Sequence, residues 1–217
     1  MGFYYASGAF GSLTNVADHG VCVGSSVWAE NANTTATSLT IKDSFFDNGI
    51  IAIATPPPAG DPPVLTADIS GNQVSPNWGT DSGSFGVYLS EVGGTVSGNS
   101  IFGRKYVDNE VFAGDTYGIY DNAPAVTVSG NSIMFEDWPA SNLDGATDGI
   151  SILADDAVVK SNKIAGVEVG IELNCHTATV SGNTINLSYY GLDGAPTGFA
   201  GVNTFYNTDV NVLSGCQ

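Results

Sequence analysis

Apolar and polar residues alternate with a period of two along several short segments of this chain. In each segment the residues three and five positions before an asparagine are apolar or small, and the residue two positions after it is apolar. A period of two is that of a β-strand with one buried face. The pattern therefore predicts short strands on both sides of each asparagine. The pairs before the asparagine are Ala67 and Ile69, Gly94 and Val96, Val126 and Val128, Ala157 and Val159, and Ala178 and Val180.

The asparagine itself belongs to a repeated motif, in which an aliphatic residue precedes Ser-Gly-Asn or a close variant and a second aliphatic residue follows. Self-similarity at a period of a few tens of residues is typical of a repeat architecture. Gly and Asn both tolerate positive φ, so the motif predicts a tight bend between two strands. We interpret these asparagines as structural, with side chains that bond along the stack. The copies span 69–74, 96–101, 128–133, 159–164 and 180–185, with a degenerate copy at 41–46.

A glycine followed by an aliphatic residue precedes the motif copies. Thirteen residues separate this glycine from the motif asparagine at 86 and 99, 118 and 131, 149 and 162, and 170 and 183, whereas the return path to the next glycine varies from 8 to 19 residues. Each repeat therefore has a fixed part and one adjustable loop, and a Pro-rich insertion at 55–63 stretches an early repeat. The glycine pairs are Gly20-Val21, Gly49-Ile50, Gly86-Val87, Gly118-Ile119, Gly149-Ile150, Gly170-Ile171 and Gly201-Val202.

Strands this short cannot each bury a core, but stacking repeat on repeat buries the inward Val and Ile residues in one column. We therefore predict an all-β fold in which like strands pair in parallel. Over about residues 20–215 the repeats resemble the coils of the pectate-lyase-like right-handed parallel β-helix superfamily. The resemblance implies a single-stranded right-handed parallel β-helix of about seven coils, with three short strands per coil and long variable loops on one side. Residues 1–19 are predicted to be an irregular N-terminal cap or partial coil, and residues 20–217 the β-helix.

That superfamily includes pectate lyases, polygalacturonases, alginate lyases and epimerases, and phage tailspikes, so its fold does not fix an activity. The resemblance places a candidate site on the outer face of the first strand, walled by the adjustable loops. The family signatures do not transfer. Asn207-Thr208-Asp209 has no following coil, and neither the Gly-His-Gly of polygalacturonases nor the Asp-Pro-His of alginate epimerases occurs.

Two sets of residues are candidates for catalysis. Asp148 and Glu172 are expected on neighbouring coils of the outer face, and a glycosidase uses two carboxylates separated by several ångströms. Arg104 and Lys105 are the second set, since the resemblance implies a Lys or Arg that abstracts the proton α to a uronate carboxylate. The alternative is that two acids share this face by chance on an acidic surface. The outward row is predicted to contain Cys22, Ile51, Tyr88, Tyr120, Ser151, Glu172 and Asn203.

Aromatic residues gather on the same outer face and in the loops expected to overhang it. Aromatic faces beside carboxylates and amides suit sugar rings, although such rings also serve to pack long loops onto a flank. The predicted sugar-binding residues are Trp78, Tyr88, Tyr106, Tyr117, Tyr120, Trp138, Tyr189 and Tyr190.

The charge balance narrows the range of partners. Five Lys plus Arg face 22 Asp plus Glu, for a net charge of −17 in 217 residues. This excludes nucleic acid, which needs a basic footprint, and disfavours an unassisted polyanionic substrate. No apolar run is long enough to span a membrane, and the acidic, Lys-poor composition favours an extracellular or cell-surface location.

The cysteines are three, far apart in sequence, and without a cluster of histidines. We therefore predict no zinc site and no cofactor; Ca²⁺ is the alternative left open, although no motif specifies a site for it. Cys175 and Cys216 are expected two coil steps apart, a geometry that disfavours a disulfide between them.

Two function classes follow. The first is a secreted carbohydrate-active β-helix that binds and cleaves a polysaccharide as a lyase or glycoside hydrolase. The second is a non-catalytic structural or adhesive module, a spike or filament subunit, that associates end to end. The second arises because no amphipathic helix precedes Gly20 or follows Val202 to cap the open strand edges.

Overall fold

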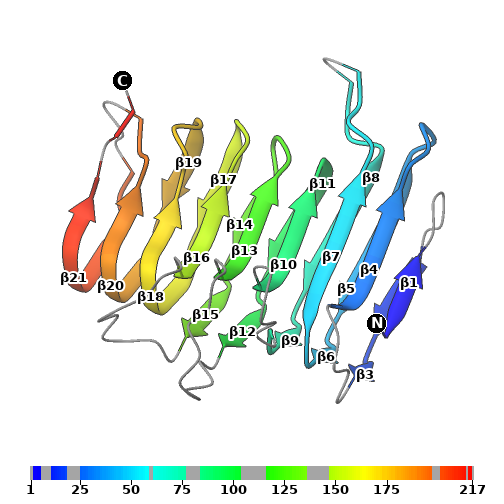
Figure 1. Ribbon diagram of the computed structural model, residues 1–217, viewed down its shortest axis with the longest axis horizontal. Helices are drawn as coiled ribbons and strands as arrows, with labels where there is room; N and C mark the ends of the chain where they lie inside the picture. Colours follow the sequence, from blue (N-terminus) through cyan, green and yellow to red (C-terminus); the bar gives the residue numbers. More distant parts are fainter. Residues whose placement is uncertain are drawn as a thin grey trace.

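The computed structural model describes residues 2–5, 11–18, 25–58, 61–76, 84–103, 116–135, 147–196, 201–213 and 215–216. Within these ranges all regular structure is β-strand, and the strands pair in parallel. They form one 14-stranded and one 7-stranded sheet, and Figure 1 shows them stacked along the longest axis. The predicted all-β class with parallel stacking is confirmed, and the arrangement is compatible with a parallel β-helix.

The chain passes repeatedly through three strand positions, and we call one such passage a coil. The first position holds β1 (Phe3–Tyr5), β4 (Ser25–Asn31), β7 (Gly49–Ala54), β10 (Ser84–Ser90), β13 (Thr116–Asn122) and β16 (Thr147–Ile152). The second holds β2 (Gly11–Thr14), β5 (Thr37–Lys42), β8 (Leu65–Ser70), β11 (Val92–Ser97), β14 (Thr127–Ser129), β17 (Ala157–Lys160) and β19 (Ala178–Ser181). The third holds β3 (Ala17–Asp18), β6 (Phe45–Phe46), β9 (Gln73–Val74), β12 (Ser100–Gly103) and β15 (Ser132–Phe135).

Three long strands join the third position of one coil to the first position of the next. They are β18 (Lys163–Glu172), β20 (Thr184–Asp193) and β21 (Thr204–Val212). The first half of β18 pairs with β15 and its second half pairs with β16, so the 14-stranded sheet folds back on itself. The long strands occur where the return path from the asparagine to the next first strand is short.

The first position places one aliphatic residue per coil in a continuous buried column. Val87, Ile119 and Ile150 lie in register and have no exposed surface, as the sequence pattern predicts. The predicted register is wrong at both ends. Val27 rather than Val21 pairs with Ile50.

At the C-terminal end, Leu192 rather than Val202 continues this column. Leu192 pairs with Ile171 and is fully buried, whereas Val202 is 79 % exposed. The cause is a short return path, because β20 runs directly from the third position into the first and makes Gly191 the glycine of this coil. The sequence spacing instead predicts a long loop here and the next coil glycine at position 201.

The recurring glycine is explained by contacts on two sides. A Cβ atom at Gly118 would lie 2.6 Å from Cγ2 of Ile133 and 2.5 Å from the carbonyl oxygen of Gly149. Gly86, Gly149 and Gly170 meet the equivalent isoleucine and the next carbonyl in the same way. The constant spacing therefore reflects a packing contact across the coil, and these positions have no room for a side chain.

The motif asparagines form a buried hydrogen-bonded ladder. Asn131 Oδ1 accepts from the backbone N–H and from Nδ2 of Asn99, at 2.9 and 3.0 Å. Its Nδ2 donates to Oδ1 of Asn162 and to the carbonyl of Val96, both at 3.0 Å. The structural interpretation is confirmed. The ladder comprises Asn72, Asn99, Asn131, Asn162, Asn183 and Asn203.

The bend beside the ladder uses the residue before each asparagine. Gly71, Gly98, Gly130 and Gly182 have φ between 63° and 67°, and Ser161 takes the same conformation at 58°. Ser44 occupies the asparagine position in the degenerate copy, where its backbone N–H donates to Asn72 Oδ1 at 3.1 Å.

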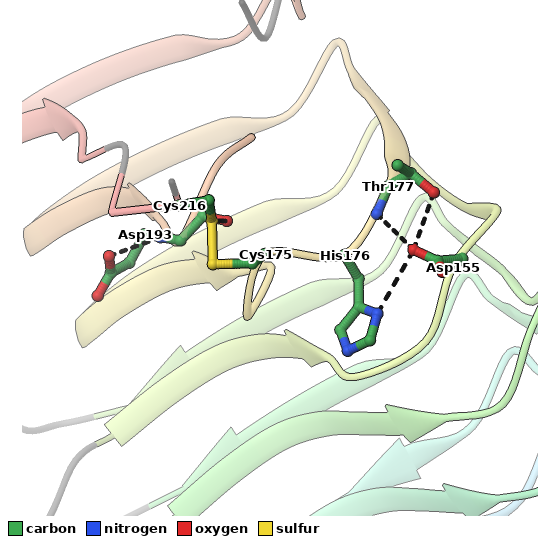
Figure 2. Close-up of a disulfide and its surroundings, with 7 residues drawn as sticks. Asp155, Cys175, His176, Thr177, Asp193 and Cys216 are labelled. Carbon is green, nitrogen blue, oxygen red and sulfur yellow. Dashed lines mark hydrogen bonds and ion pairs between the residues drawn. A yellow bond between two sulfur atoms is a disulfide. The ribbon is translucent and has the colours of Figure 1, made fainter. Parts of the chain in front are cut away.

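A disulfide joins Cys175 to Cys216 with Cα atoms 5.3 Å apart, so the prediction that disfavoured this bridge is wrong (Figure 2). The backbone N–H of Cys175 bonds to the Gly194 carbonyl on the next coil. Ala195 donates to the Leu213 carbonyl, so the C-terminal segment lies beside that same turn. Cys175 follows β18 and Cys216 follows β21, so the expected two coil steps do separate the strands that carry them, and the bridge forms across this separation. Cys22 lies outside the described residues.

Candidate functional site

The outer face of the first strand position carries a row of side chains that differ from coil to coil. The register aligns Tyr88 with Tyr120, Tyr120 with Ser151, and Ser151 with Glu172, as the sequence spacing predicts. Asp193 rather than Asn203 follows Glu172, and Trp28 rather than Cys22 aligns with Ile51. We call the residues Tyr88, Tyr120, Ser151, Glu172 and Asp193 the outer row.

A second line of side chains runs beside the outer row. Phe85 aligns with Tyr117, and Tyr117 aligns with Asp148. Asp148 then aligns with Val169. Val169 aligns with Tyr190, whereas the sequence spacing predicts Ala200 at this place.

Four rings from these two lines form one aromatic cluster, defined as Phe85, Tyr88, Tyr117 and Tyr120. Tyr88 stacks on Tyr120 with ring centroids 5.0 Å apart, and Phe85 stacks on Tyr117 at 5.4 Å. Edge-to-face contacts of 4.8 and 5.0 Å join the rings within each strand. The cluster is half-buried on β10 and β13, so it offers an apolar platform with phenol hydroxyls.

The cluster borders a polar group formed by Ser151, Glu172 and Asn174. The Ser151 hydroxyl donates to Glu172 Oε2 at 2.8 Å, and Asn174 Nδ2 donates to Ser151 Oγ at 3.4 Å. Burial, followed by the neighbouring Tyr88 and Glu172, raises the pKa of Tyr120. Tyr120 therefore keeps its proton over a wide pH range and can donate a hydrogen bond next to the carboxylate.

Asp148 belongs to the same face but is 2 % exposed. It aligns with Val169, which lies three residues before Glu172 in β18. Three residues of strand correspond to about 10 Å along the chain, so Asp148 and Glu172 do not face each other directly across neighbouring strands.

Tyr189 and Tyr190 add a second aromatic pair on β20, with ring centroids 4.6 Å apart. Burial raises the pKa of Tyr190, as do the nearby Tyr189, Asp193 and Glu168. The outer face thus has aromatic rings toward both ends and carboxylates between and beside them.

Several predicted site residues lie outside the described part of the chain: Trp78, Arg104, Lys105, Tyr106 and Trp138. Other residues of the face were not among the predicted site residues. Phe85 could have been found because it holds the same place before its glycine as Tyr117. Asp193 was missed because the sequence spacing predicts the last coil glycine at position 201, which places Asn203 rather than Asp193 after Glu172.

Other features of the described residues do not coincide with this face. A cavity of about 290 Å³ is lined by Asn33, Thr34 and the prolines of 56–63, at the turn between β7 and β8. No group of three or more His, Cys, Asp or Glu side chains in the described ranges is placed to hold a metal ion. The same ranges contain no helix with the length and apolar character needed to cross a membrane.

Comparison with protein-family models, curated proteins and solved structures finds no match to this chain.

Proposed function

We propose that this chain is a secreted polysaccharide-binding protein of the pectate-lyase-like type, a right-handed parallel β-helix of about seven coils. The observation that carries the proposal is the aromatic cluster beside the Ser151–Glu172 hydrogen bond on one outer face. Rings supply apolar contact to the C–H faces of a sugar, while phenols, Ser151 and the carboxylates meet its hydroxyl groups.

The length of the outer row fits an extended chain ligand. Four coil steps separate Tyr88 from Asp193, which corresponds to about 19 Å at the usual strand spacing. A short oligosaccharide lying along the stack contacts Tyr88 and Tyr120 at one end and Asp193 and Tyr190 at the other.

The charge of the face favours a neutral glycan over a uronic one. Glu168, Glu172 and Asp193 repel a polyanion, and the net charge of −17 adds to this repulsion. The uronate-lyase alternative depends on Arg104 and Lys105 as proton-abstracting bases.

Cleavage is the second part of the proposal, with Asp148 and Glu172 as the acid and base pair. Glu172 accepts a hydrogen bond from Ser151 and suits the role of base, while buried Asp148 suits the role of acid. Their offset along the strand favours the wide carboxyl separation of inverting hydrolases over the roughly 5 Å separation of retaining ones.

Binding is tested by affinity electrophoresis and calorimetry on neutral and uronic polysaccharides. We expect Tyr120→Ala and Tyr88→Ala each to weaken binding about tenfold, because each removes a ring of the platform. Tyr206→Ala is the control, since Tyr206 is 55 % exposed in the third strand position of β21. Equal affinities for all three variants, or no binding of wild type to any glycan, would refute the proposed binding face.

Cleavage is tested by release of reducing ends from the glycans that bind. We expect Glu172→Gln to abolish release while glycan affinity is retained, and NMR of the first product to show an inverted anomer. Binding without any turnover leaves the binding proposal intact and removes the catalytic part.

The alternative function is a structural or adhesive module that associates end to end. It is favoured by β21, whose outer edge has no strand partner among the described residues and carries exposed Tyr206 and Val212. We expect such a module to show concentration-dependent oligomers in light scattering that Tyr206→Lys abolishes. A monomer at all concentrations contradicts the alternative.

The extracellular or cell-surface location is supported by the Cys175–Cys216 disulfide, since structural disulfides persist in oxidising compartments. Mass spectrometry of protein from its native source should find this pair oxidised. Two free thiols in that material contradict the location. No cofactor is part of the proposal.

A further inference from the structure

Asp121 lies in the hydrophobic core, with no exposed surface. It follows Tyr120 on β13 but points the other way, into the inward column of the first strand position. Its in-register neighbours on β10 and β16 are Leu89 and Ile152, both fully buried, and Leu89 aligns in turn with Ala52. A carboxyl group thus occupies a place where the adjacent coils have aliphatic side chains.

Among the described residues, no side chain forms a hydrogen bond with this carboxyl. Neither oxygen makes a hydrogen bond of good geometry. Burial raises the pKa of Asp121 to about 8, and the backbone N–H of Ala123 only partly offsets this rise. A buried acid without a partner is tolerated when neutral and strongly disfavoured when ionised.

The titratable groups on the packed elements do not change this balance. The segment after β10 contains Glu91, and the turn after β16 contains Asp155 and Asp156. All three are acids at the half-buried or exposed surface, so none supplies the positive charge that would stabilise an ionised Asp121. The side chains packed beside it from β10 and β16 are aliphatic.

The position of Asp121 couples it to the aromatic cluster. The same strand carries Tyr117 and Tyr120 on its outer face, stacked on Phe85 and Tyr88 of β10. A shift of β13 that brings the Asp121 carboxylate to water also displaces Tyr117 and Tyr120, which are half of the cluster.

We propose that Asp121 is a pH-sensitive switch in the middle of the stack, whose ionisation loosens β13 and disorders the aromatic cluster on the opposite face. The inference does not depend on a glycan, because the order of the cluster can be observed directly.

The sign of the effect follows from linkage. The pKa of Asp121 rises from 3.8 in the unfolded chain to about 8 in the folded one. Its contribution to stability is therefore full below about pH 4, falls as the pH rises toward 8, and is constant above that. Within this window each pH unit lowers the folded-to-unfolded ratio by up to about tenfold.

The test compares wild type with Asp121→Asn and Asp121→Leu from about pH 5 to about pH 9. We expect the wild-type unfolding temperature to fall by several degrees across this range, and that of both variants to fall much less. The tyrosine signal in near-ultraviolet circular dichroism should weaken reversibly above about pH 8 in wild type only. Asp155→Asn is the control. Hydrogen bonds from Thr177 and the adjacent His176 lower the pKa of Asp155 (Figure 2), so this variant should keep the wild-type dependence of the unfolding temperature on pH over this range.

The inference is refuted if the unfolding temperatures of wild type and Asp121→Leu change with pH in parallel. It is also refuted if the wild-type tyrosine signal is constant to about pH 9. Asp121→Leu restores the aliphatic column and serves if Asp121→Asn does not fold. Carboxyl-detected NMR of the wild-type protein gives an independent result. Titration of Asp121 near its usual value of 3.8 would also overturn the inference.

Discussion

The asparagine ladder and the outer row run along the same coils, yet they are built by opposite rules. In the ladder, successive coils supply the same residue, and the Asn131 amide uses both its donors and accepts two hydrogen bonds. In the outer row, successive coils supply Tyr, Tyr, Ser, Glu and Asp. The ladder is buried except at its last member, Asn203, whereas most of the outer row is half-buried.

This difference separates what the fold requires from what it permits. A ladder position is fixed by its neighbours, because a substitution leaves buried donors of the preceding coil without an acceptor. An outer position has no equivalent constraint, so a residue there is free to serve binding or chemistry. In a stacked protein the repeated residues therefore identify the fold, and the positions that vary identify the candidate site.

The largest expected effect is at the centre of the ladder. Asn131→Ala leaves the backbone N–H and Nδ2 of Asn99 without their acceptor in a buried place. We expect a loss of about 4 kcal/mol in the free energy of unfolding, measured by chemical denaturation. Asn203→Ala at the end of the ladder is the matched control. There the half-buried acceptor can be replaced by water, so a loss of about 1 kcal/mol is expected. Equal losses would show that the ladder does not act through burial.

The next largest loss of stability is expected at Gly118, which we compare with Gly130 of the same coil. Gly118→Ala places a Cβ against the Gly149 carbonyl and Ile133, and we expect a loss of about 3 kcal/mol. Gly130→Ala meets no atom closer than 3.9 Å and carries only the cost of its φ of 66°, about 1 kcal/mol. Thermal unfolding measures both. A larger loss for Gly130→Ala would mean that conformation, rather than packing, selects glycine in these coils.

The sequence predicted the parallel strands, the buried column and the central part of the outer row, because these depend on spacings within one coil. The prediction from sequence was wrong where the number of residues per coil changes. At the C-terminal end a strand replaced the expected loop, which moved the coil glycine from 201 to 191. Such a change depends on how two coils meet, and periodicity within a coil does not report it.

Asp121 shows a different limit. It occupies the third place after its glycine, where other coils have Leu89 and Ile152, so the comparison of coils could have revealed it. The packing of the four rings could not be predicted in the same way. Alignment of Phe85 with Tyr117 gives adjacency, but the stacked and edge-to-face geometry depends on side-chain torsions.

A smaller effect is expected from exchanging residues at the ladder bend. Ser161 has φ of 58°, where neighbouring coils have Gly130 and Gly182. Ser161→Gly should stabilise the protein by about 0.5 kcal/mol, because relief of the left-handed strain exceeds the added freedom of the unfolded chain. Gly182→Ser should cost a similar amount, and the double exchange should nearly cancel. Differential scanning calorimetry checks the three variants, and destabilisation by Ser161→Gly would reveal a role for the Ser161 hydroxyl.

The smallest effect is expected on the outer row, where the comparison with the ladder is most direct. Glu172→Gln keeps an acceptor for the Ser151 hydroxyl and removes a charge next to Asp193, so the free energy of unfolding should change by less than about 0.5 kcal/mol. Urea denaturation of the variant and of Asn131→Ala under the same conditions gives the contrast. A loss above about 2 kcal/mol would make the Glu172 carboxylate a structural requirement. In that case variation along the row would no longer indicate a site free to evolve a function.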